Sequence, residues 1–318
     1  VRPTCDARSP WRDGFERQPA EAFSSIRPVS PTVAAVGRRS VRFAGMPDQD
    51  HDPSLDPELQ LLVDLHLGHE RQGPGSPETT RRAIDLAGLR TNPDRPLRIA
   101  DLGCGTGASA LVLAEALAAD PSESSGVEIV AIDGIAAFIE RLRERVADRG
   151  LSGRLEGRVA DMAALPFGDG EFDVLWSEGA IYNIGFEHGA RIWRRHLRPG
   201  GLLAVTELSW TSADRPAEIE RHWQTAYPGI ATPSENLARL ERAGYMPIGF
   251  FMLPASCWSN YHDPIEASLP AFLERHADGP HRETARAIAE GERAEIDLRR
   301  RYGAFFNYAF HLARTPAE

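Results

Sequence analysis

The chain has 318 residues, and its 36 basic residues are all arginine, against 46 acidic residues and a formal net charge of -10. The absence of lysine excludes a P-loop lysine, a pyridoxal Schiff base and a lysine general base. The acidic balance argues against a nucleic-acid partner, which needs a basic surface, and no apolar run approaches the ~20 residues of a membrane span.

The first part of the chain differs in composition from the rest. Residues 1–52 are rich in proline, serine and arginine, so we expect a disordered extension, with Met46 as the expected true start. We expect residues 53–318 to form one catalytic domain, which is long enough to bury a substantial core. Scattered cysteines without metal-ligand spacing predict no metal site and a reduced, cytoplasmic compartment. These cysteines are Cys5, Cys104 and Cys257.

Two helices are expected before the first strand. Residues 57–67 place apolar side chains at helical spacing and predict the first of them. A polar, glycine-rich loop follows over residues 68–75. Ser76 and Pro77 then supply an N-cap and a proline at the first helical position, which predicts a second helix from about residue 78.

The most informative run of the sequence is Leu97–Gly107. Its apolar first half predicts a buried strand over Leu97–Leu102, and a helical pattern begins at Ala108. Between them stand three glycines at alternate positions, Gly103, Gly105 and Gly107. Glycine reaches positive φ at low cost and lets a ligand approach the bare backbone, while a helix N-terminus offers free N–H groups. Strand, glycine turn and helix together predict a cradle for a nucleotide cofactor.

The glycine spacing alone leaves two cofactors open, because Gly103, Gly105 and Ala108 also satisfy the dinucleotide fingerprint. Asp101 argues against a dinucleotide, because a carboxylate there repels a pyrophosphate. It favours a cofactor with an amino-acid moiety, whose ammonium it can orient. The run Asp-Leu-Gly-Cys-Gly-Thr-Gly closely resembles motif I of the class I S-adenosylmethionine-dependent methyltransferases. The resemblance implies that the whole run binds S-adenosylmethionine, including Cys104, Thr106 and Gly107.

Later positions extend this resemblance. An apolar strand over residues 127–132 ends in Asp133 and Gly134, where family members place an acidic residue on the ribose hydroxyls of the adenosine. Asp133 is alternatively a helix N-cap, and one carboxylate can serve both roles. Asp161 stands where the family binds the adenine amino group, with Met162 or its neighbour packed on the ring; the alternative is a plain loop aspartate. The motifs most resemble the small-molecule branch related to ubiquinone and menaquinone biosynthesis methyltransferases.

The order of elements predicts an α/β fold with a Rossmann-like, doubly wound, seven-stranded sheet, mostly parallel with one antiparallel strand. Strands are expected near residues 97, 127, 155, 172, 201, 247 and 305, and helices near 78, 108, 135, 187, 215 and 234. In the resembled family the last strand belongs to a hairpin, here formed by the segments 246–253 and 304–313.

About fifty residues separate these two segments, far more than a hairpin turn needs. We therefore predict a helical insertion at about 257–302, with helices over 264–276 and 281–301. Together with the helix at 57–67, the insertion is expected to cover the acceptor side of the pocket as a lid. The helix at 281–301 carries charge around much of its circumference, which predicts a solvated face.

Methyl transfer from an activated donor requires mainly alignment and exclusion of water, and a base only where the acceptor must lose a proton. Glu178 and Tyr182 follow the fourth strand, at the sheet edge where such folds bind ligands, and we predict both as catalytic residues. The alternative is that Glu178 bonds nearby backbone N–H groups and Tyr182 packs under the lid. Glu207, after the fifth strand, is a weaker candidate. Arg71 is predicted to hold the methionine carboxylate.

Other side chains have weaker signals. His66 and His69 are candidates to flank the pocket, and four large aromatics line an acceptor cavity or belong to the core. These aromatics are Trp210, Trp223, Trp258 and Tyr261. We predict an S-adenosylmethionine-dependent methyltransferase that acts on a small-molecule acceptor, and we allow for a homodimer. The alternatives are an NAD(P)-dependent oxidoreductase and a non-catalytic subunit that binds S-adenosylmethionine.

Overall fold

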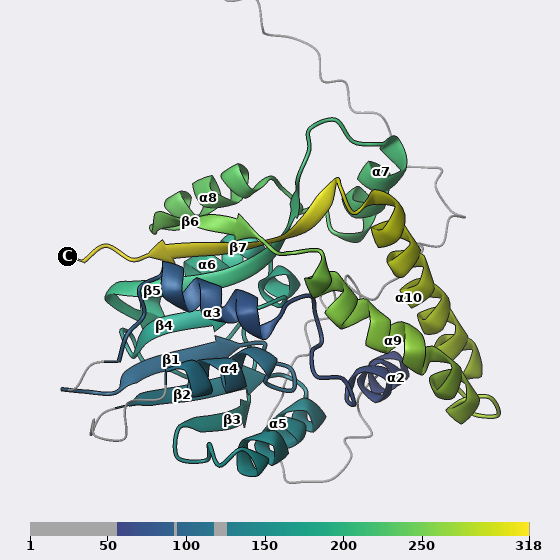
Figure 1. The fold of residues 1–318 in the computed structure, drawn as a ribbon, viewed down its shortest axis with the longest axis horizontal. Helices are drawn as coiled ribbons and strands as arrows, with labels where there is room; N and C mark the ends of the chain where they lie inside the picture. The colour runs from purple at the N-terminus through teal and green to yellow at the C-terminus, as the bar shows by residue number, and fades with distance from the viewer. Residues whose placement is uncertain (1–55, 92–93, 118–125, 318) are drawn as a thin grey trace, which may run out of the picture.

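The computed structural model describes residues 56–91, 94–117 and 126–317, and the extension expected over 1–52 lies outside this part. Seven strands form one sheet in the order β3-β2-β1-β4-β5-β7-β6 (Figure 1). Neighbouring strands are parallel except in the two pairs that involve β7, which runs antiparallel to β5 and β6. The predicted mostly parallel sheet with one antiparallel strand is confirmed.

The strands are β1 (Leu97–Leu102), β2 (Val127–Asp133), β3 (Leu155–Val159), β4 (Phe172–Ser177), β5 (Leu197–Trp210), β6 (Met246–Met252) and β7 (Phe306–Arg314). The helices before β5 are α2 (Pro57–His66), α3 (Pro77–Leu86), α4 (Ala108–Ala116), α5 (Ala136–Asp148), η1 (Ile181–Ile184), α6 (Phe186–Trp193) and η2 (Arg194–His196). Those after it are α7 (Ala217–Ala226), α8 (Pro233–Arg242), α9 (Ser256–Arg275) and α10 (Arg282–Tyr302).

Helices cover both faces of the sheet. On one face α3, α4 and α5 pack over strand residues such as Ile99 and Val174. On the other face α6 and α8 pack over Ala100 and Leu175, the residues that follow Ile99 and Val174 in the chain. Alternate residues of a strand point to opposite faces, so both sets are buried. This explains why the central strands are continuous apolar runs in the sequence rather than alternating patterns.

The helices α2, α9 and α10 form a third layer beside the edge where the parallel strands end (Figure 1). We call this layer the lid; its core includes Leu61, Ile265 and Phe272. The insertion lies between β6 and β7, as predicted. Its first helix begins at Ser256 rather than at Pro264 and continues through that proline. The earlier start buries one face of the first turns, which offsets the hydrogen bond that a helical proline removes.

The fifth strand also differs from the prediction. A strand was expected near residue 201, with Glu207 after it, whereas β5 runs over Leu197–Trp210 as one element. Its second half pairs with β7 as far as Trp210 opposite Phe306. The pairing partner comes from the far end of the chain, so local sequence gave no sign of it. As a result Glu207 lies inside β5 and not after it.

Gly107 provides a test of the junction between the glycine turn and α4. Its φ is +87°, and a Cβ there would lie 2.1 Å from Leu142 Cδ1 in the core. Gly150 has a similar φ of +67° with open space around the Cβ position. We expect Gly150→Ala to lower the free energy of unfolding by ~1–2 kcal/mol from backbone strain alone.

Gly107→Ala should lose a further ~1–3 kcal/mol, because the methyl group overpacks a filled core. Urea denaturation of the two variants measures the difference. An equal loss of stability in both would contradict the close packing of the turn against Leu142.

Candidate cofactor and acceptor site

The glycine turn after β1 has the backbone shape that the sequence predicts. Gly103, Gly105 and Gly107 have φ values of 70°, 54° and 87°. A Cβ at Gly103 would lie 2.4 Å from Ala180 Cβ, and one at Gly105 would lie 2.4 Å from Gln72 Oε1. Two other loops therefore approach the turn so closely that no side chain fits. The result is a bare backbone at the N-terminus of α4.

The loop between α2 and α3, residues 67–76, lies against this turn. Thr106 N donates to Gln72 Oε1 at 2.9 Å. Arg145 of α5 donates through Nη1 to Thr106 O at 2.8 Å and to Glu70 O at 3.1 Å. Sequence reasoning missed these contacts, because they join three segments that are far apart in the chain. They hold the loop over the start of α4.

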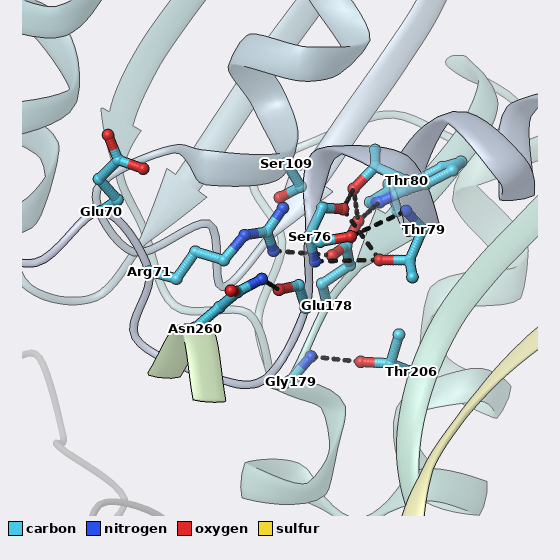
Figure 2. Close-up of polar contacts among 12 residues, drawn as sticks. Glu70, Arg71, Ser76, Thr79, Thr80, Ser109, Glu178, Gly179, Thr206 and Asn260 are labelled. Carbon is cyan, nitrogen blue, oxygen red and sulfur yellow. Dashed lines mark hydrogen bonds and ion pairs between the residues drawn. The ribbon is translucent and has the colours of Figure 1, made fainter. Parts of the chain in front are cut away.

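A buried ion pair joins this loop to the segment after β4. Arg71 Nη1 lies 3.1 Å from Glu178 Oε2 (Figure 2). Glu178 Oε1 accepts hydrogen bonds from Thr80 Oγ1 at 2.7 Å and from Trp176 Nε1 at 3.0 Å. The partners of Glu178 are thus side chains rather than the backbone groups that we considered. Both of its oxygens are engaged by these donors, so this geometry favours a positioning role.

Two buried atoms beside this ion pair, Asp101 Oδ1 and Arg71 Nη2, have no hydrogen-bond partner among the described residues. Asp101 is 0% exposed, and its other oxygen accepts from Ser109 Oγ at 2.6 Å. Burial raises the pKa of Asp101 to about 7; the Ser109 bond and Arg71 oppose this, and Glu178 adds to it. Buried polar groups are costly when unpaired, so the pair is suited to a ligand with one ammonium and one carboxylate.

Asp133 lies at the end of β2, beside the glycine turn. Its Oδ2 accepts from Gly105 N and its Oδ1 from Ile135 N, each at 2.9 Å. Burial raises the pKa of Asp133, and these backbone donors oppose the rise. Each carboxylate oxygen keeps a further lone pair, so these bonds are compatible with the predicted ribose contact. At Gly134 nothing lies within 4 Å of the Cβ position.

Asp161 and Met162 follow β3 on the same side of the sheet. Asp161 Oδ1 accepts from Ala163 N at 2.8 Å, which is the contact of an ordinary loop aspartate. Met162 Cε lies 3.6 Å from the Cβ position of Gly103, so this side chain reaches the glycine turn. Cys104 is buried in the turn itself, and burial raises the pKa of its thiol well above the usual value. The thiol is therefore neutral.

The predicted acceptor residues lie farther along the same sheet edge. Tyr182 is in η1, and its ring meets the ring of Tyr227 edge-on at 6.0 Å. Glu207 is 1% exposed, and the Tyr227 phenol is its hydrogen-bonding neighbour. Burial raises the pKa of Glu207 to about 8, although Tyr227 and Arg239 oppose this. Burial and the charges of Glu295 and Glu207 raise the pKa of the Tyr182 phenol, so both carboxylates lie within its electrostatic reach.

α10 has the exposed face that its charge predicts, but its inner face is buried and carries two acidic residues. Glu292 and Glu295 are 1% and 4% exposed. His66 Nε2 of α2 lies 3.5 Å from Glu292 Oε1, and His262 Nε2 of α9 lies 3.7 Å from Glu295 Oε1. A stripe of buried residues at helical spacing was the available signal, and the high charge of the helix obscured it. The stripe also contains Ala285, Ile288, Ala289 and Ile296.

The four large aromatics are mostly core residues. They are Trp210, Trp223, Trp258 and Tyr261, and each is 7% exposed or less. Trp258 Nε1 donates to Asn307 Oδ1 at 2.7 Å, and the Trp223 ring meets Phe306 edge-on at 5.2 Å. Tyr261 differs, because it stacks on His66 at 6.2 Å between two lid helices. It therefore borders the region that contains Glu292.

Within the described ranges, no group of three or more histidine, cysteine or acidic side chains is arranged to hold a metal ion. The same ranges contain no helix with the length and apolar character needed to cross a membrane.

Comparisons with known proteins agree with this geometry. Residues 99–201 match the family model described as a methyltransferase domain. The chain is 29% identical over 230 residues to a 27-O-demethylrifamycin SV methyltransferase of Amycolatopsis mediterranei, covering 69% of this chain and 76% of that protein. It is 38% identical to a demethylmenaquinone methyltransferase of Thermus thermophilus, covering 40% of this chain and 53% of that protein.

A solved structure has the same fold. It is a SAM-dependent methyltransferase from Geobacter sulfurreducens in complex with S-adenosyl-L-homocysteine. The TM-score is 0.66 at 19% sequence identity, over 80% of this chain and 97% of that one. Together the family match, the curated relatives and the motifs show an S-adenosylmethionine-dependent methyltransferase domain in this chain, with S-adenosylmethionine as cosubstrate, and the solved structure shares its fold.

Gly75 tests whether the position of Arg71 controls donor binding. A Cβ at Gly75 would lie 2.5 Å from Arg71 Nη1 and 3.2 Å from Glu178 Oε2. We expect Gly75→Ala to displace the guanidinium and weaken S-adenosylhomocysteine binding roughly ten- to a hundredfold, the loss of one charged hydrogen bond of ~1.5–3 kcal/mol. Calorimetry measures the affinity.

Gly68→Ala is the matched control, because Gly68 lies in the same loop with nothing within 4 Å of its Cβ position. Equal affinities in the two variants would show that the position of Arg71 does not control donor binding.

Proposed function

We propose that the chain transfers a methyl group to a small-molecule acceptor that binds between the lid and the sheet edge. The observation that carries the donor half is the pair of unpartnered buried atoms, Asp101 Oδ1 and Arg71 Nη2. They have the charges needed for the ammonium and the carboxylate of the methionine moiety of S-adenosylmethionine. In this proposal Glu178 holds Arg71 in place through the ion pair.

The adenosine half of the donor extends along the glycine turn. Asp133 is proposed to bind the ribose hydroxyls, with the bare backbone of Gly134 beside it, because it borders the turn and keeps free lone pairs. Asp161 is proposed to accept from the adenine amino group and Met162 to pack on the ring. The contact distance between Met162 and the Gly103 position supports this placement.

S-adenosylmethionine supplies an activated methyl group on a sulfonium. The residues of the chain have to align the acceptor, exclude water and accept a proton where the acceptor carries one. Tyr182 borders the acceptor region and stays protonated, since burial raises the pKa of its phenol, so it is suited to donate a hydrogen bond. Glu178 is less suited to accept a proton than Glu207, because Glu178 already accepts from three donors.

The cellular setting is part of the proposal. Cys104 and Cys257 are both free and buried, which supports a reduced, cytoplasmic compartment.

Donor binding should depend on pH through Asp101. Its pKa of about 7 in the folded chain lies above the unfolded value of 3.8, so its contribution to stability falls as the pH rises between these values. A bound ammonium favours the ionised carboxylate. The affinity for S-adenosylhomocysteine should therefore increase as the pH rises toward about 7, by up to about tenfold per pH unit for one proton, and then level off.

Calorimetry across pH 5.5–8 on the protein and on Asp101→Asn is the measurement. The variant should bind more weakly and lose the pH dependence that Asp101 causes. Titration with NAD on the same samples tests the oxidoreductase alternative. Tight NAD binding without S-adenosylhomocysteine binding would reject the proposed donor site.

Asp133→Ala tests the ribose contact. Removing a charged acceptor of hydroxyl hydrogen bonds should weaken S-adenosylhomocysteine binding roughly ten- to a hundredfold. Because Asp133 also accepts from two backbone N–H groups, thermal melting must accompany calorimetry. A folded variant with unchanged affinity would remove Asp133 from the donor site.

A further inference from the structure

Three carboxylates near the acceptor side are buried with few hydrogen bonds. Glu207 of β5 and Glu292 and Glu295 of α10 are 1%, 1% and 4% exposed. The Tyr227 phenol is the hydrogen-bonding neighbour of Glu207. Among the described residues, no hydrogen bond reaches either oxygen of Glu292 or Oε1 of Glu295. Burying unpaired carboxylates is costly, so a group that is absent from the chain itself is expected to complete them.

Two of these carboxylates act on the same pair of tyrosines. The sheet supplies Glu207, and the lid supplies Glu295. Burial and the charges of both carboxylates raise the pKa of Tyr182 and of Tyr308, so each phenol lies within electrostatic reach of both. We call this region, bordered by Glu207, Glu295, Glu292, Tyr182 and Tyr308, the acidic chamber.

The acidic chamber adjoins the donor site. Gly179 N, next to Glu178, donates to Thr206 Oγ1 at 2.7 Å (Figure 2). Thr206 directly precedes Glu207, and Gly179 lies three residues before Tyr182. One hydrogen bond thus joins the donor segment to the sheet side of the chamber.

The chain supplies little positive charge to the acidic chamber. His66 and His262 lie 3.5 and 3.7 Å from Glu292 and Glu295, and His66 Nδ1 and His262 Nε2 have no hydrogen-bond partner among the described residues. Both histidines are more than nine-tenths buried. Burial lowers the pKa of the neighbouring His69 and His222, which favours their neutral forms.

Arginine compensates these carboxylates only weakly. No arginine forms an ion pair with them in the part of the chain that the structure describes. Arg239 acts on Glu207 from a distance, while its Nη1 donates to Gly229 O and Asn236 Oδ1. The two histidines each lie against one lid carboxylate, and neither of them forms an ion pair with Glu207.

We propose that the methyl acceptor is a small amine, bound as its ammonium ion by the carboxylates of the acidic chamber against the rings of Tyr182 and Tyr308. The inference rests on the proposed function and assigns its substrate class. Buried carboxylates pair with an ammonium, and aromatic rings attract cations through their π faces. A neutral alcohol would leave the negative charge of the chamber uncompensated.

The chamber also provides for the proton that an ammonium must lose. A carboxylate oxygen takes the proton from the nitrogen, and the freed lone pair forms a bond to the methyl carbon. The bond between that carbon and the sulfur breaks, its electron pair returns to sulfur, and a thioether and a methylated ammonium result. Burial raises the pKa of Glu207 to about 8, closer to that of an ammonium, so Glu207 is suited to this transfer.

The first experiment measures binding without turnover. Benzyltrimethylammonium, which cannot be methylated, and neutral benzyl alcohol are titrated into the protein saturated with S-adenosylhomocysteine. We expect the cation to bind at least tenfold more tightly than the alcohol. Glu295→Gln and Glu207→Gln should each lower the affinity for the cation at least fivefold and leave S-adenosylhomocysteine binding within twofold of the original value.

Glu290→Gln is the matched control, because Glu290 lies on the exposed side of α10. It should change neither affinity. Glu292→Gln gives a third chamber variant, so the test stands if one of the others fails to fold. Equal binding of the cation and the alcohol, or a cation affinity unaffected by the chamber variants, overturns the inference.

The second experiment measures S-adenosylhomocysteine release with pools of primary and secondary amines, of alcohols and phenols, and of carboxylic acids. Release with the amine pool, reduced at least tenfold in a chamber variant, supports the proposal. Release with one of the other pools and not with amines overturns the amine class while leaving methyl transfer intact. Failure of the protein to bind S-adenosylhomocysteine at all would instead overturn the proposed function.

Discussion

The buried ion pair between Arg71 and Glu178 is the contact on which the arrangement of the site depends, since it joins the α2–α3 loop to the end of β4 (Figure 2). Removing one partner of such a pair strands a charge away from water and typically costs about 3–5 kcal/mol, whereas the intact pair adds little net stability. The role of the ion pair is therefore to fix the position of the Arg71 guanidinium rather than to stabilise the fold. It sets the guanidinium beside Asp101, and it orders the loop that covers the glycine turn.

The same loop also connects the donor side to the lid. Asn260 of α9 donates to Gly75 O at 3.1 Å, and Gly75 N donates to Cys257 O at 3.3 Å. Gly75 in turn lies against Arg71. A shift of α9 on acceptor binding would thus reach the guanidinium through one short backbone segment. Donor and acceptor binding are in this way linked by contacts and not only by proximity.

Local patterns were sufficient to predict the fold and the donor motif. The strand–glycine–helix run from Leu97 is contiguous in sequence, and its turn needs glycine for reasons of backbone geometry alone. The acidic chamber was not predictable in this way. Glu207 was expected after its strand, because the extension of β5 depends on pairing with β7. Glu292 and Glu295 were not singled out, because a helix rich in charge hides a narrow buried stripe until its partners α2 and α9 are known.

The insertion between β6 and β7 has a consequence for the order in which the chain folds. In an ordinary hairpin two to five residues would join these strands, whereas here α9 and α10 separate Met252 from Phe306. A loop more than ten times longer raises the entropic cost of closure by roughly 2 kcal/mol, because the cost grows with the logarithm of length. Docking of α9 on α10 shortens the effective loop before the strands meet. β7 has to enter between β5 and β6, so docking of the two helices that bound the acceptor region favours the step that completes the sheet.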